Sequence, residues 1–407
     1  MALTFLSCAG QTAETSETVT EPTTGYATET EEITETEIQT ETETEEVTEQ
    51  QIPEEKGTVE LYQLAPEGMS LMMSYVIVTP NKQIVVIDGG IDGSGVEAKP
   101  YLPNAIRAIL GLNENDPFEV EAWFLSHAHR DHFYELAKML NEYTAESNYR
   151  INNFYFDYPD IGVEWDSAAG SGDYDLERLG KLKKGFDNYY SINKFTGIKG
   201  AEIPEDKFTA PEGEENYYYD LINGAVINEE AVEQGLTVTV DGVEFRIMMT
   251  WWKEARYVNS TSVIIKMSFD GQSVLFLGDA HEDSGKRLLQ MYDAEELKAD
   301  YVQMSHHGQG GTDQAFYDAI DAEKSIRLWP TPSWVWNDAK TYAIGKTRSW
   351  LGLPVEAADF KKAGLLETGF DFVAGLYRRY PSQGHKFEKW TQKVLDAQRV
   401  AVLGKAE

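Results

Sequence analysis

Short apolar runs separated by turn residues occur along most of the chain and predict many β-strands. Two of the turns, Asp241-Gly242 and Asp270-Gly271, lie between apolar segments and are typical of β-hairpins. A third hairpin is expected around Pro80-Asn81-Lys82. The predicted strands are, in chain order, Thr58–Leu64, Met72–Val78, Gln83–Ile87, Val120–Leu125, Leu236–Val240, Val243–Met248, Ser262–Ser268, Ser273–Leu277, Tyr301–Met304 and Ser325–Trp329.

Apolar residues at helical spacing predict helices between and after these strands. The predicted helices are Tyr101–Leu112, Phe133–Tyr143, Leu176–Ser191, Ser284–Met291, Gln314–Ala322 and Lys386–Leu403. Strand clusters flanked by helices indicate a layered α/β sandwich. Residues 157–235 are rich in Tyr, Gly, Asp and Lys, with one predicted helix and little strand character. We expect this stretch to be an inserted, lid-like segment over the core.

The start of the chain has a different composition from the rest. Residues 9–56 consist largely of Thr and Glu, can bury almost nothing and repel one another, so we expect a disordered tether. The folded domain should then span residues 57–385, followed by a C-terminal helix within residues 386–407. No stretch approaches the roughly eighteen apolar residues that a membrane-spanning helix needs.

The charge of the chain bears on its partners. The formal net charge is −34, of which residues 1–56 contribute −14 and the remainder −20. Because the folded part is itself acidic, we expect no broad electrostatic attraction to nucleic acid. A local basic groove around Lys181, Lys183 and Lys184 would be the exception.

The single cysteine, Cys8, excludes a disulfide framework and a cysteine-rich zinc site. It follows the short apolar run Ala2–Ser7, which resembles the end of a bacterial lipoprotein signal. On this interpretation residues 1–8 are the remnant of a signal, and the protein is an extracellular, cell-surface lipoprotein held to the membrane only by a lipid on Cys8. The run is short and lacks preceding basic residues, so a free thiol in a flexible terminus is the alternative.

A cluster of possible metal ligands lies directly after a predicted strand and before a predicted helix. It comprises His127, His129, Asp131 and His132, within six positions. Three imidazoles and a carboxylate suit zinc, and also manganese or iron. Alternate side chains of extended backbone point the same way, so His127 and His129 can share one ion. Asp131 and His132, in the first turn of the helix, can face a second ion.

This run, His-x-His-x-Asp-His after a buried strand, resembles the signature of the metallo-β-lactamase superfamily, which implies a four-layer αββα sandwich. Two further segments are similar to markers of that family in the expected order. Asp88, before Gly89-Gly90, resembles the aspartate that supports the metal-binding loop, although an ordinary turn residue would look the same. Asp279, after the strand Val274–Leu277, resembles the aspartate that bridges two metals.

The segment Ser305-His306-His307-Gly308 is similar to the late strand end whose histidine completes the second metal site. The consecutive histidines, and Asn259–Val263 before the Gly-Asp strand, most resemble the subgroup that contains the extracellular-facing domain of the DNA-uptake competence protein ComEC. The resemblance implies that His307 is the ligand and that His306 contacts the substrate or a bridging water. The reverse assignment is the alternative.

The resemblance covers roughly residues 58–335 outside the insertion, and it has one departure. Many members of the family carry a further metal-binding histidine between the cluster and the bridging aspartate, whereas no histidine occurs here from residue 133 to residue 280. The first metal is then left with His127, His129 and Asp279, with Asp157, Asp160 or water as possible replacements. We expect two metal ions, and one tightly held ion is the alternative.

Other noticeable residues have plainer interpretations. His281, directly after the bridging aspartate, is expected at a helix start, and His385 is expected on the surface. The aromatic run Trp329–Trp336 could line a pocket for a cationic or ring-bearing group, or could pack in the core. The pair Trp251-Trp252 is more typical of a structural role.

Together these residues predict a metal-dependent hydrolase. A bound divalent metal lowers the pKa of water from about 15.7 towards 7, so metal-bound hydroxide can attack a phosphorus or carbonyl centre. The expected catalytic residues are Asp131, Asp279 and His306, with Asp131 or Asp279 orienting the nucleophile. The expected ligands of one or two zinc (Zn2+) ions, with manganese or iron as alternatives, are His127, His129, Asp131, His132, Asp279 and His307.

The substrate class follows only from the resemblance. The subgroup favours phosphoester or phosphodiester hydrolysis, and a small or envelope-derived phosphodiester suits an acidic, tethered enzyme better than long DNA. Hydrolysis of a lactam, lactone or thioester is one alternative. A surface protein that holds metal only to bind or sense a ligand is another, although a full ligand set argues against it.

Overall fold

Two large sheets and their flanking helices make up the part of the chain that the computed structural model describes. The described residues are 57–64, 72–91, 101–158, 176–193, 227–330, 344–353 and 392–404. They all belong to the unit Glu55–Glu407. Among them, none of the helices combines the length and the apolar character that crossing a lipid bilayer requires.

The first sheet has the strand order β14-β1-β2-β3-β5-β7. Its strands are β1 (Val59–Gln63), β2 (Tyr75–Val78), β3 (Ile84–Ile87), β5 (Ala122–Phe124), β7 (Phe154–Tyr155) and β14 (Arg399–Leu403). β14, β1, β2 and β3 pair antiparallel, and β3, β5 and β7 pair parallel. The hairpin predicted around Pro80-Asn81-Lys82 is confirmed.

The second sheet has the strand order β13-β12-β11-β10-β9-β8. Its strands are β8 (Thr237–Val240), β9 (Val243–Met249), β10 (Ile264–Phe269), β11 (Gln272–Phe276), β12 (Tyr301–Gln303) and β13 (Ile326–Leu328). β8 to β11 pair antiparallel, so both predicted Asp-Gly hairpins are confirmed, and β11, β12 and β13 pair parallel. A separate pair joins β4 (Phe118–Val120) to β6 (Tyr149–Ile151).

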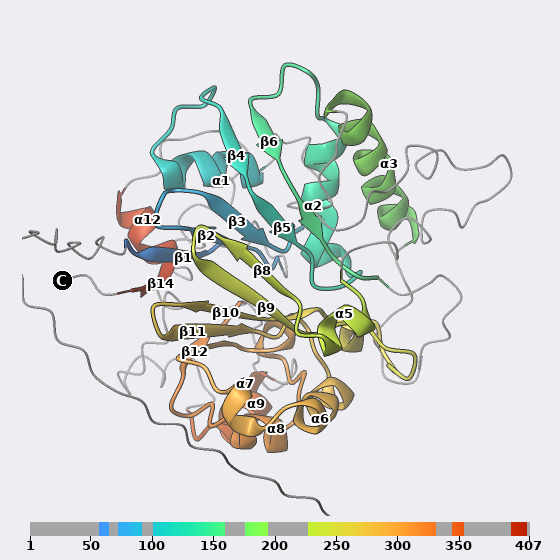
Figure 1. The fold of residues 1–407 in the computed structure, drawn as a ribbon, viewed down its shortest axis with the longest axis vertical. Helices are drawn as coiled ribbons and strands as arrows, with labels where there is room; N and C mark the ends of the chain where they lie inside the picture. The colour runs from blue at the N-terminus through green and yellow to red at the C-terminus, as the bar shows by residue number, and fades with distance from the viewer. Residues whose placement is uncertain are drawn as a thin grey trace, which may run out of the picture. The chain divides into compact units, whose positions relative to one another are not determined.

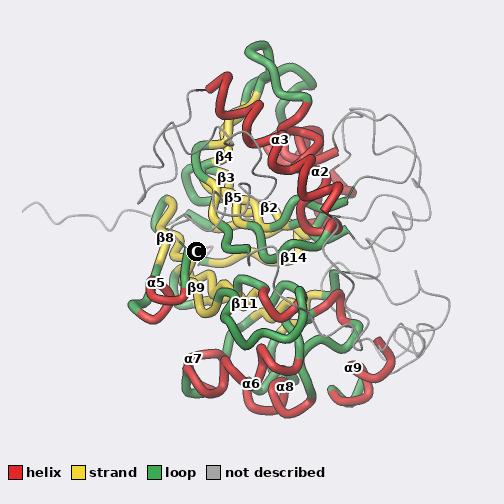
Figure 2. The backbone as a smooth tube through the Cα atoms, turned by 90° about the vertical axis from the view of Figure 1, so that its right-hand side faces the viewer, coloured by secondary structure: helices red, strands yellow, loops and turns green. Residues whose placement is uncertain are grey.

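Helices cover the outer face of each large sheet, which gives the four layers helix, sheet, sheet and helix (Figure 1). The perpendicular view shows the same succession (Figure 2). Over the first sheet lie α1 (Tyr101–Leu110), α2 (Arg130–Asn141) and α3 (Leu176–Asn193), and over the second lie α6 (Glu282–Met291), α7 (Ala294–Leu297), α8 (Gln314–Ala319) and α9 (Ile344–Trp350). Shorter elements are α5 (Glu229–Glu233), η3 (Asn259–Thr261), η4 (His306–Gly308) and α12 (Gln392–Gln398).

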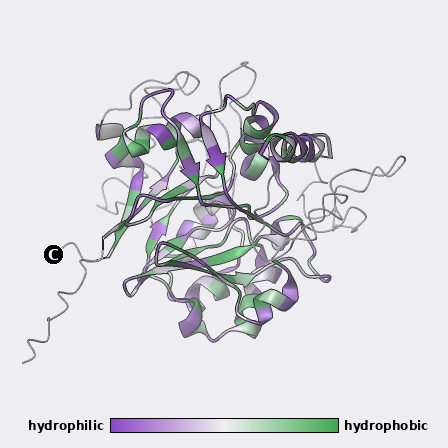
Figure 3. Cartoon of the chain, turned by 45° about the horizontal axis from the view of Figure 1, so that its top comes forward, coloured by the Kyte–Doolittle hydropathy of each residue, from purple (hydrophilic) through white to green (hydrophobic). Residues whose placement is uncertain are grey.

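Three apolar clusters fill the three interfaces between these layers. Along β3, Val86 packs in the cluster under α1 and α2, whereas Val85 and Ile87 pack between the sheets. Along β11, Phe276 faces the other sheet and Leu275 faces α6 and α8. Alternate side chains of a strand point to opposite faces, so these continuous apolar runs are what a strand covered on both sides requires. Colouring by hydropathy shows the apolar strands and the mixed faces of the helices (Figure 3).

Two predictions differ from the structure. The single strand Val120–Leu125 is wrong, because Glu121 separates β4 from β5 and the two strands belong to different sheets. The final helix was expected to reach Leu403, but it ends at Gln398, and Arg399–Leu403 forms β14 beside β1. Pairing with an available sheet edge has outweighed helical spacing in this short apolar segment.

The predicted insertion is described only in part. Its helix α3 is present and packs against α2, where the side-chain amide of Asn188 donates hydrogen bonds to the carbonyl oxygens of Leu140 and Tyr143. Leu182 and Tyr189 of α3 are buried in the same apolar cluster as α2. This helix is therefore a packed part of the outer layer. Residues 159–175 and 194–226 of the insertion lie outside the described residues, as do Cys8, the tether and His385.

Candidate metal centre

Asp88 organises the turn that carries the histidine cluster. It follows β3 in the left-handed region, with φ 65°, and its side chain is buried. Its carboxylate accepts hydrogen bonds from the backbone N–H of Ser126 at 2.7 Å and from Ser126 Oγ at 2.9 Å. The same carboxylate lies 2.7 Å from Nδ1 of His132. A carboxylate in this position holds the proton on Nδ1 and leaves Nε2 of His132 to face the centre.

The N-terminus of α2 lies directly against the turn after β3. A side chain at Gly89 would place its Cβ 2.7 Å from Cβ of Leu136, so only glycine permits this approach. His129 is the N-cap of α2, in extended conformation, and helical geometry begins at Arg130. Asp131 and His132 therefore lie in the first helical turn, as the sequence predicted.

The second sheet contributes its residues from the ends of two adjacent parallel strands. Asp279 follows β11, and its backbone N–H donates to Ser262 Oγ at 3.1 Å. His306 and His307 follow β12 with φ 51° and 57°, and Gly308 continues the turn with φ 81°. Left-handed backbone at a non-glycine residue costs on the order of 1–3 kcal/mol and is concentrated at functional sites. The ring of Trp329 packs so closely on Gly308 that no Cβ would fit there.

Gln303 joins these two strand ends. Its buried side-chain Oε1 accepts from the backbone N–H of Leu277 at 2.7 Å. Its Nε2 donates to the carbonyl oxygen of Gly278 at 2.9 Å and to that of Met304 at 2.7 Å. The backbone N–H of His306 also donates to the carbonyl oxygen of Gly278 at 3.1 Å. These hydrogen bonds together set the separation between the segment that carries Asp279 and the segment that carries His307.

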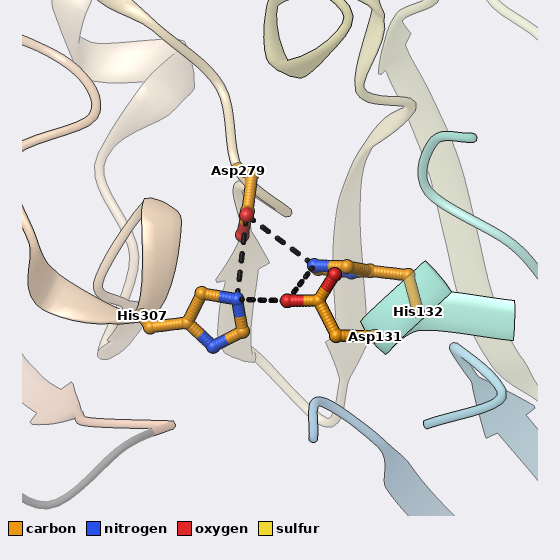
Figure 4. Close-up of side chains that lie close together, drawn as sticks. All are labelled: Asp131, His132, Asp279 and His307. Carbon is orange, nitrogen blue, oxygen red and sulfur yellow. Dashed lines mark ion pairs between the residues drawn. The ribbon is translucent and has the colours of Figure 1, made fainter. Parts of the chain in front are cut away.

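Four of the predicted residues converge from the two halves of the molecule (Figure 4). This four-residue group consists of Asp131, His132, Asp279 and His307. Nε2 of His307 lies 3.1 Å from Asp131 Oδ2 and 3.3 Å from Asp279 Oδ2. Nε2 of His132 lies 3.3 Å from Asp279 Oδ2 and 3.9 Å from Asp131 Oδ2. All four side chains are buried or nearly so.

A second cluster shares Asp279 with the first. This three-residue group consists of His127, His129 and Asp279. Nε2 of His127 lies 3.1 Å from Nδ1 of His129 and 3.9 Å from Asp279 Oδ2. Nδ1 of His127 lies 3.1 Å from Ser126 Oγ. The pair of histidines predicted to share one ion is therefore brought together.

Both groups have the spacing that a metal ion needs. Ligand atoms about 2.1 Å from a common ion can be at most about 4.2 Å apart, and every distance given above is shorter. Within the described part of the chain, Asp279 Oδ1 and His132 Nε2 are buried without a hydrogen-bond partner. Buried polar atoms are nearly always hydrogen-bonded, so atoms left in this state beside other possible ligands fit a bound cation.

The charges of the centre also fit a bound cation. Burial lowers the pKa of His307, but the carboxylates of Asp279 and Asp131 outweigh it and raise the pKa to about 9. Burial likewise opposes protonation of His132, yet Asp279 and Asp88 raise its pKa well above the usual value. The two buried carboxylates thus demand positive charge, and a metal ion would replace protons on these imidazoles.

His127 and His306, in contrast, are neutral imidazoles. Burial and the neighbouring His132 hold the pKa of His127 well below the usual value. Burial lowers the pKa of His306 to about 4, despite the opposing effect of Asp279. A neutral imidazole has a lone pair for a metal ion, or one N–H to donate to another molecule.

The structure separates the two consecutive histidines. His307 is buried within the four-residue group, whereas the side chain of His306 is 31% exposed and its Nε2 lies 4.0 Å from Asp279 Oδ2. His306 therefore lies at the margin of the centre. His281 is the N-cap of α6, as predicted, and its ring contacts Tyr257 and His306.

Other predicted participants lie outside the two groups. The carboxylate of Asp157 accepts hydrogen bonds from Thr250 Oγ1 at 2.7 Å and Trp251 Nε1 at 3.2 Å. Asp160 lies outside the described residues. Trp329 is buried in the core, and the rest of its aromatic run is not described.

Two residues that support the centre were not predicted from the sequence. Ser126 is a small hydroxyl residue directly before the first histidine of the cluster, and Gln303 is an amide within an otherwise apolar predicted strand. A polar side chain in a strand buried on both faces needs a partner, and that requirement was the available signal.

Two of the three lysines considered for a nucleic-acid-binding groove make side-chain contacts with neighbouring residues. Lys181 donates to the hydroxyl of Tyr134 at 3.2 Å, and Lys183 pairs with Asp187 at 2.8 Å. Lys184 is exposed on the same helix. A neighbouring carboxylate therefore balances the charge of Lys183.

Comparison with known proteins identifies one family. The model of the metallo-beta-lactamase superfamily matches residues 73–290, which include the histidine cluster and Asp279. No curated protein matches the sequence.

Several solved structures are similar at low identity. A mutant of the CmlA beta-hydroxylase has 12% identity and a TM-score of 0.29, over 60% of this chain and only 35% of its own. A diphosphatase from the PhnP family has 11% identity and a TM-score of 0.32, over 66% of this chain and 84% of its own. The short form of human tRNase Z has 12% identity and a TM-score of 0.34, over 67% of this chain and 92% of its own.

Proposed function

The chain belongs to the metallo-beta-lactamase superfamily, and from this premise we propose that it is a metal-dependent hydrolase of phosphoesters or phosphodiesters. The observation that carries the proposal is the convergence of six ligand-type side chains, with Asp279 shared by the two groups, each within metal-ligand spacing of a neighbour. Two of them, His127 and His129, come from the turn after β5, two from the first turn of α2, and two from strand ends of the second sheet.

Two sets of side chains would bind the two cations. Asp131, His132, Asp279 and His307 would hold one ion, and His127, His129 and Asp279 the other. Bound divalent cations supply Lewis acidity, which lowers the pKa of water from about 15.7 towards 7 and polarises a substrate oxygen. Zinc suits this mixture of imidazole and carboxylate donors, and manganese or iron would also be accepted.

Three residues position the reactants. Asp131, whose side chain is 14% exposed, is the more accessible carboxylate and can accept a hydrogen bond from the attacking water. Asp279, which is 2% exposed, orients the same water from the buried side. His306, at the margin and neutral, can donate a hydrogen bond to an oxygen of the substrate.

The choice of a phosphoester rests on the resemblance of His306-His307-Gly308 to the ComEC-type subgroup. A small or envelope-derived phosphodiester fits better than long DNA, because the folded part of the chain is acidic and Asp187 balances the charge of Lys183. Lactam, lactone or thioester hydrolysis would use the same centre on a carbonyl carbon and is the competing assignment.

The test joins elemental analysis to a substrate panel. Purified protein loaded with zinc or manganese is offered bis(p-nitrophenyl) phosphate, a cyclic dinucleotide, an acyl-lactone and nitrocefin. We expect metal-dependent turnover of the phosphodiesters, which Asp131→Ala and His307→Ala abolish and which Asp318→Ala, an exposed carboxylate on α8, leaves unchanged. Turnover of the lactone or nitrocefin alone would reassign the substrate, and ligand binding without any turnover would favour a binding protein.

We also propose that the enzyme is a cell-surface lipoprotein, with Cys8 lipidated and the Thr/Glu-rich segment as its spacer. Expression of the full chain behind an intact lipoprotein signal, with an alkyne fatty acid in the medium, should label the protein and place it in the membrane fraction. Cys8→Ser should remove both the label and the membrane association. Equal labelling of the variant would disprove the anchor.

A further inference from the structure

We infer that the two ligand groups bind their ions unequally, so that the four-residue group takes the first and tighter ion and the three-residue group an exchangeable second one. This inference rests on the proposed metal centre but not on any particular substrate. It concerns the order of loading, which follows from how this chain's own residues hold the two groups.

The number of donors is the first difference. Two imidazoles and two carboxylates face one another in the four-residue group, which completes the tetrahedral set of a closed site. Among the described residues, the other group brings together two imidazoles and the shared Asp279. Three protein ligands leave positions for water and substrate, as is usual in catalytic zinc sites.

The residue that could have completed the smaller group is engaged elsewhere. Asp157 lies two residues after β7, at the same sheet edge from which His127 departs. Thr250 and Trp251 each donate a hydrogen bond to one of its carboxylate oxygens. To reach an ion it would have to give up these hydrogen bonds. Asp279 is therefore the main source of negative charge for the second ion, and the first ion shares this carboxylate.

The support behind the ligands is the second difference. His132 is backed by the carboxylate of Asp88 at 2.7 Å, whereas His127 is backed by the neutral hydroxyl of Ser126 at 3.1 Å. A carboxylate behind an imidazole increases its basicity and fixes its orientation, and losing such a partner typically weakens metal binding by about 10–100-fold.

The rigidity of the ligands is the third difference, and it also favours the four-residue group. The segments that carry Asp279 and His307 are joined through Gln303, and the turn at His307 is packed under Trp329. His129 is instead partly exposed, at the boundary between a loop and α2. Preorganised ligands lose less conformational entropy when an ion binds, so the four-residue group should bind more tightly.

The experiment titrates zinc into metal-free protein against a chromophoric chelator and counts bound ions by elemental analysis after gel filtration. For the wild type we expect two classes of site whose dissociation constants differ by at least about 10-fold. His129→Ala should retain one ion, with a dissociation constant within about 3-fold of the tight class. His307→Ala should weaken the tight class by at least about 100-fold.

Further variants keep the outcome interpretable. Asp157→Asn, which removes the charge but keeps a hydrogen-bond acceptor, should leave both classes unchanged, and circular dichroism checks the fold of each variant. If His307→Ala does not fold, Asp88→Asn makes the same test, with an expected loss of about 10–100-fold in the tight class. Loss of the tight ion in His129→Ala, or two equal sites in the wild type, would overturn the inference. The measured quantity is bound metal, so the inference and the proposed function can fail separately. Unequal loading with no phosphodiester turnover would disprove only the proposed function. A protein that binds no ion would disprove the proposed function and the inference.

Discussion

The two halves of the molecule bring their residues to the centre in different ways. The first half supplies His127, His129, Asp131 and His132 from a single strand-to-helix turn, backed by Asp88. The second half supplies Asp279 and His307 from the ends of two strands that lie side by side but are far apart in the sequence. One half depends on local backbone geometry, and the other on hydrogen bonds between distant segments.

This difference has a physical consequence. In the first half, alternation along extended backbone and the first turn of α2 already direct the side chains, so the loop needs only one buried carboxylate as support. In the second half nothing local sets the distance between Asp279 and His307. Hydrogen bonds from the amide of Gln303 and from the N–H of His306 to the segment before Asp279 set it, together with the strained turn at His306 and His307. The second half should therefore be the more sensitive to changes away from the ligands.

Removing the residue that both ligand groups share should have the largest effect. Asp279 contacts imidazoles of both groups, so Asp279→Ala should reduce bound zinc to less than one ion per chain and lower kcat by at least about 1,000-fold. Elemental analysis and phosphodiester turnover measure the two effects. Asp283→Ala, a carboxylate near the start of α6 outside both groups, is the control, and an Asp279→Ala protein that keeps two ions would contradict the shared role.

The second largest effect is expected from breaking the hydrogen bonds that Gln303 makes between the two strand ends of the second half. Gln303→Leu leaves the N–H of Leu277 buried without its hydrogen-bond partner and removes one donor from the carbonyl oxygens of Gly278 and Met304. The carbonyl oxygen of Gly278 keeps the hydrogen bond from the N–H of His306, whereas a buried group left unsatisfied costs about 1–3 kcal/mol. We expect a clearly lower free energy of unfolding and, in addition, a tight-class zinc dissociation constant raised by about 10-fold or more.

The matched control for this change lies on the same strand. Val302→Ala creates a cavity in β12 but keeps the amide, so it should lower stability without changing zinc affinity. Chemical denaturation and chelator competition separate the two quantities. If both variants lowered stability and neither altered zinc affinity, Gln303 would have only a structural role.

Changing the first half's support should have a smaller effect. Asp88→Asn keeps the shape of the side chain but removes the charge behind His132 and one acceptor for Ser126. Zinc affinity should fall by about 10–100-fold, while the histidines remain close together because the backbone still places them. Chelator competition gives the affinity, and an unchanged dissociation constant would show that Asp88 acts only as a turn residue.

The smallest effect is expected at an exposed contact between the two halves. Asp241, in the β8–β9 turn, accepts a hydrogen bond from the backbone N–H of Asn81, in the β2–β3 turn, at 2.6 Å. Partial burial acts to raise the pKa of Asp241, but hydrogen bonds from Asn81 and Thr79 outweigh it and lower the pKa below 3.8. The stabilisation is therefore present above pH 3.8 and is lost as the pH falls through the lower, folded-state pKa.

Asp241→Asn tests that contact and still tolerates the left-handed backbone of the turn. We expect a loss of less than about 1 kcal/mol in the free energy of unfolding at pH 7, and a smaller difference from the wild type as the pH approaches 3. Urea denaturation across this pH range measures it. A difference that does not change with pH would mean that the carboxylate charge is not the cause.

The sequence by itself determined most of the elements and the candidate metal-binding residues. Apolar runs and Asp-Gly turns predicted ten strands, nine of which correspond to strands of the two sheets, because side-chain period and turn chemistry are local properties. The crowded histidines after a strand likewise identified the metal-binding turn. Only Val120–Leu125 and the end of the final helix were wrong, and both depend on which neighbouring strand is available for pairing.

Only the tertiary structure decided how the centre is divided. It placed His307 inside and His306 at the margin, engaged Asp157 with Thr250 and Trp251, and revealed Gln303 as the link between two strand ends. These outcomes depend on contacts between residues far apart in the chain, and local pattern contains no information about such distances. A sequence can therefore name the candidate ligands of this centre, whereas their division into two groups is a property of the packed sheets.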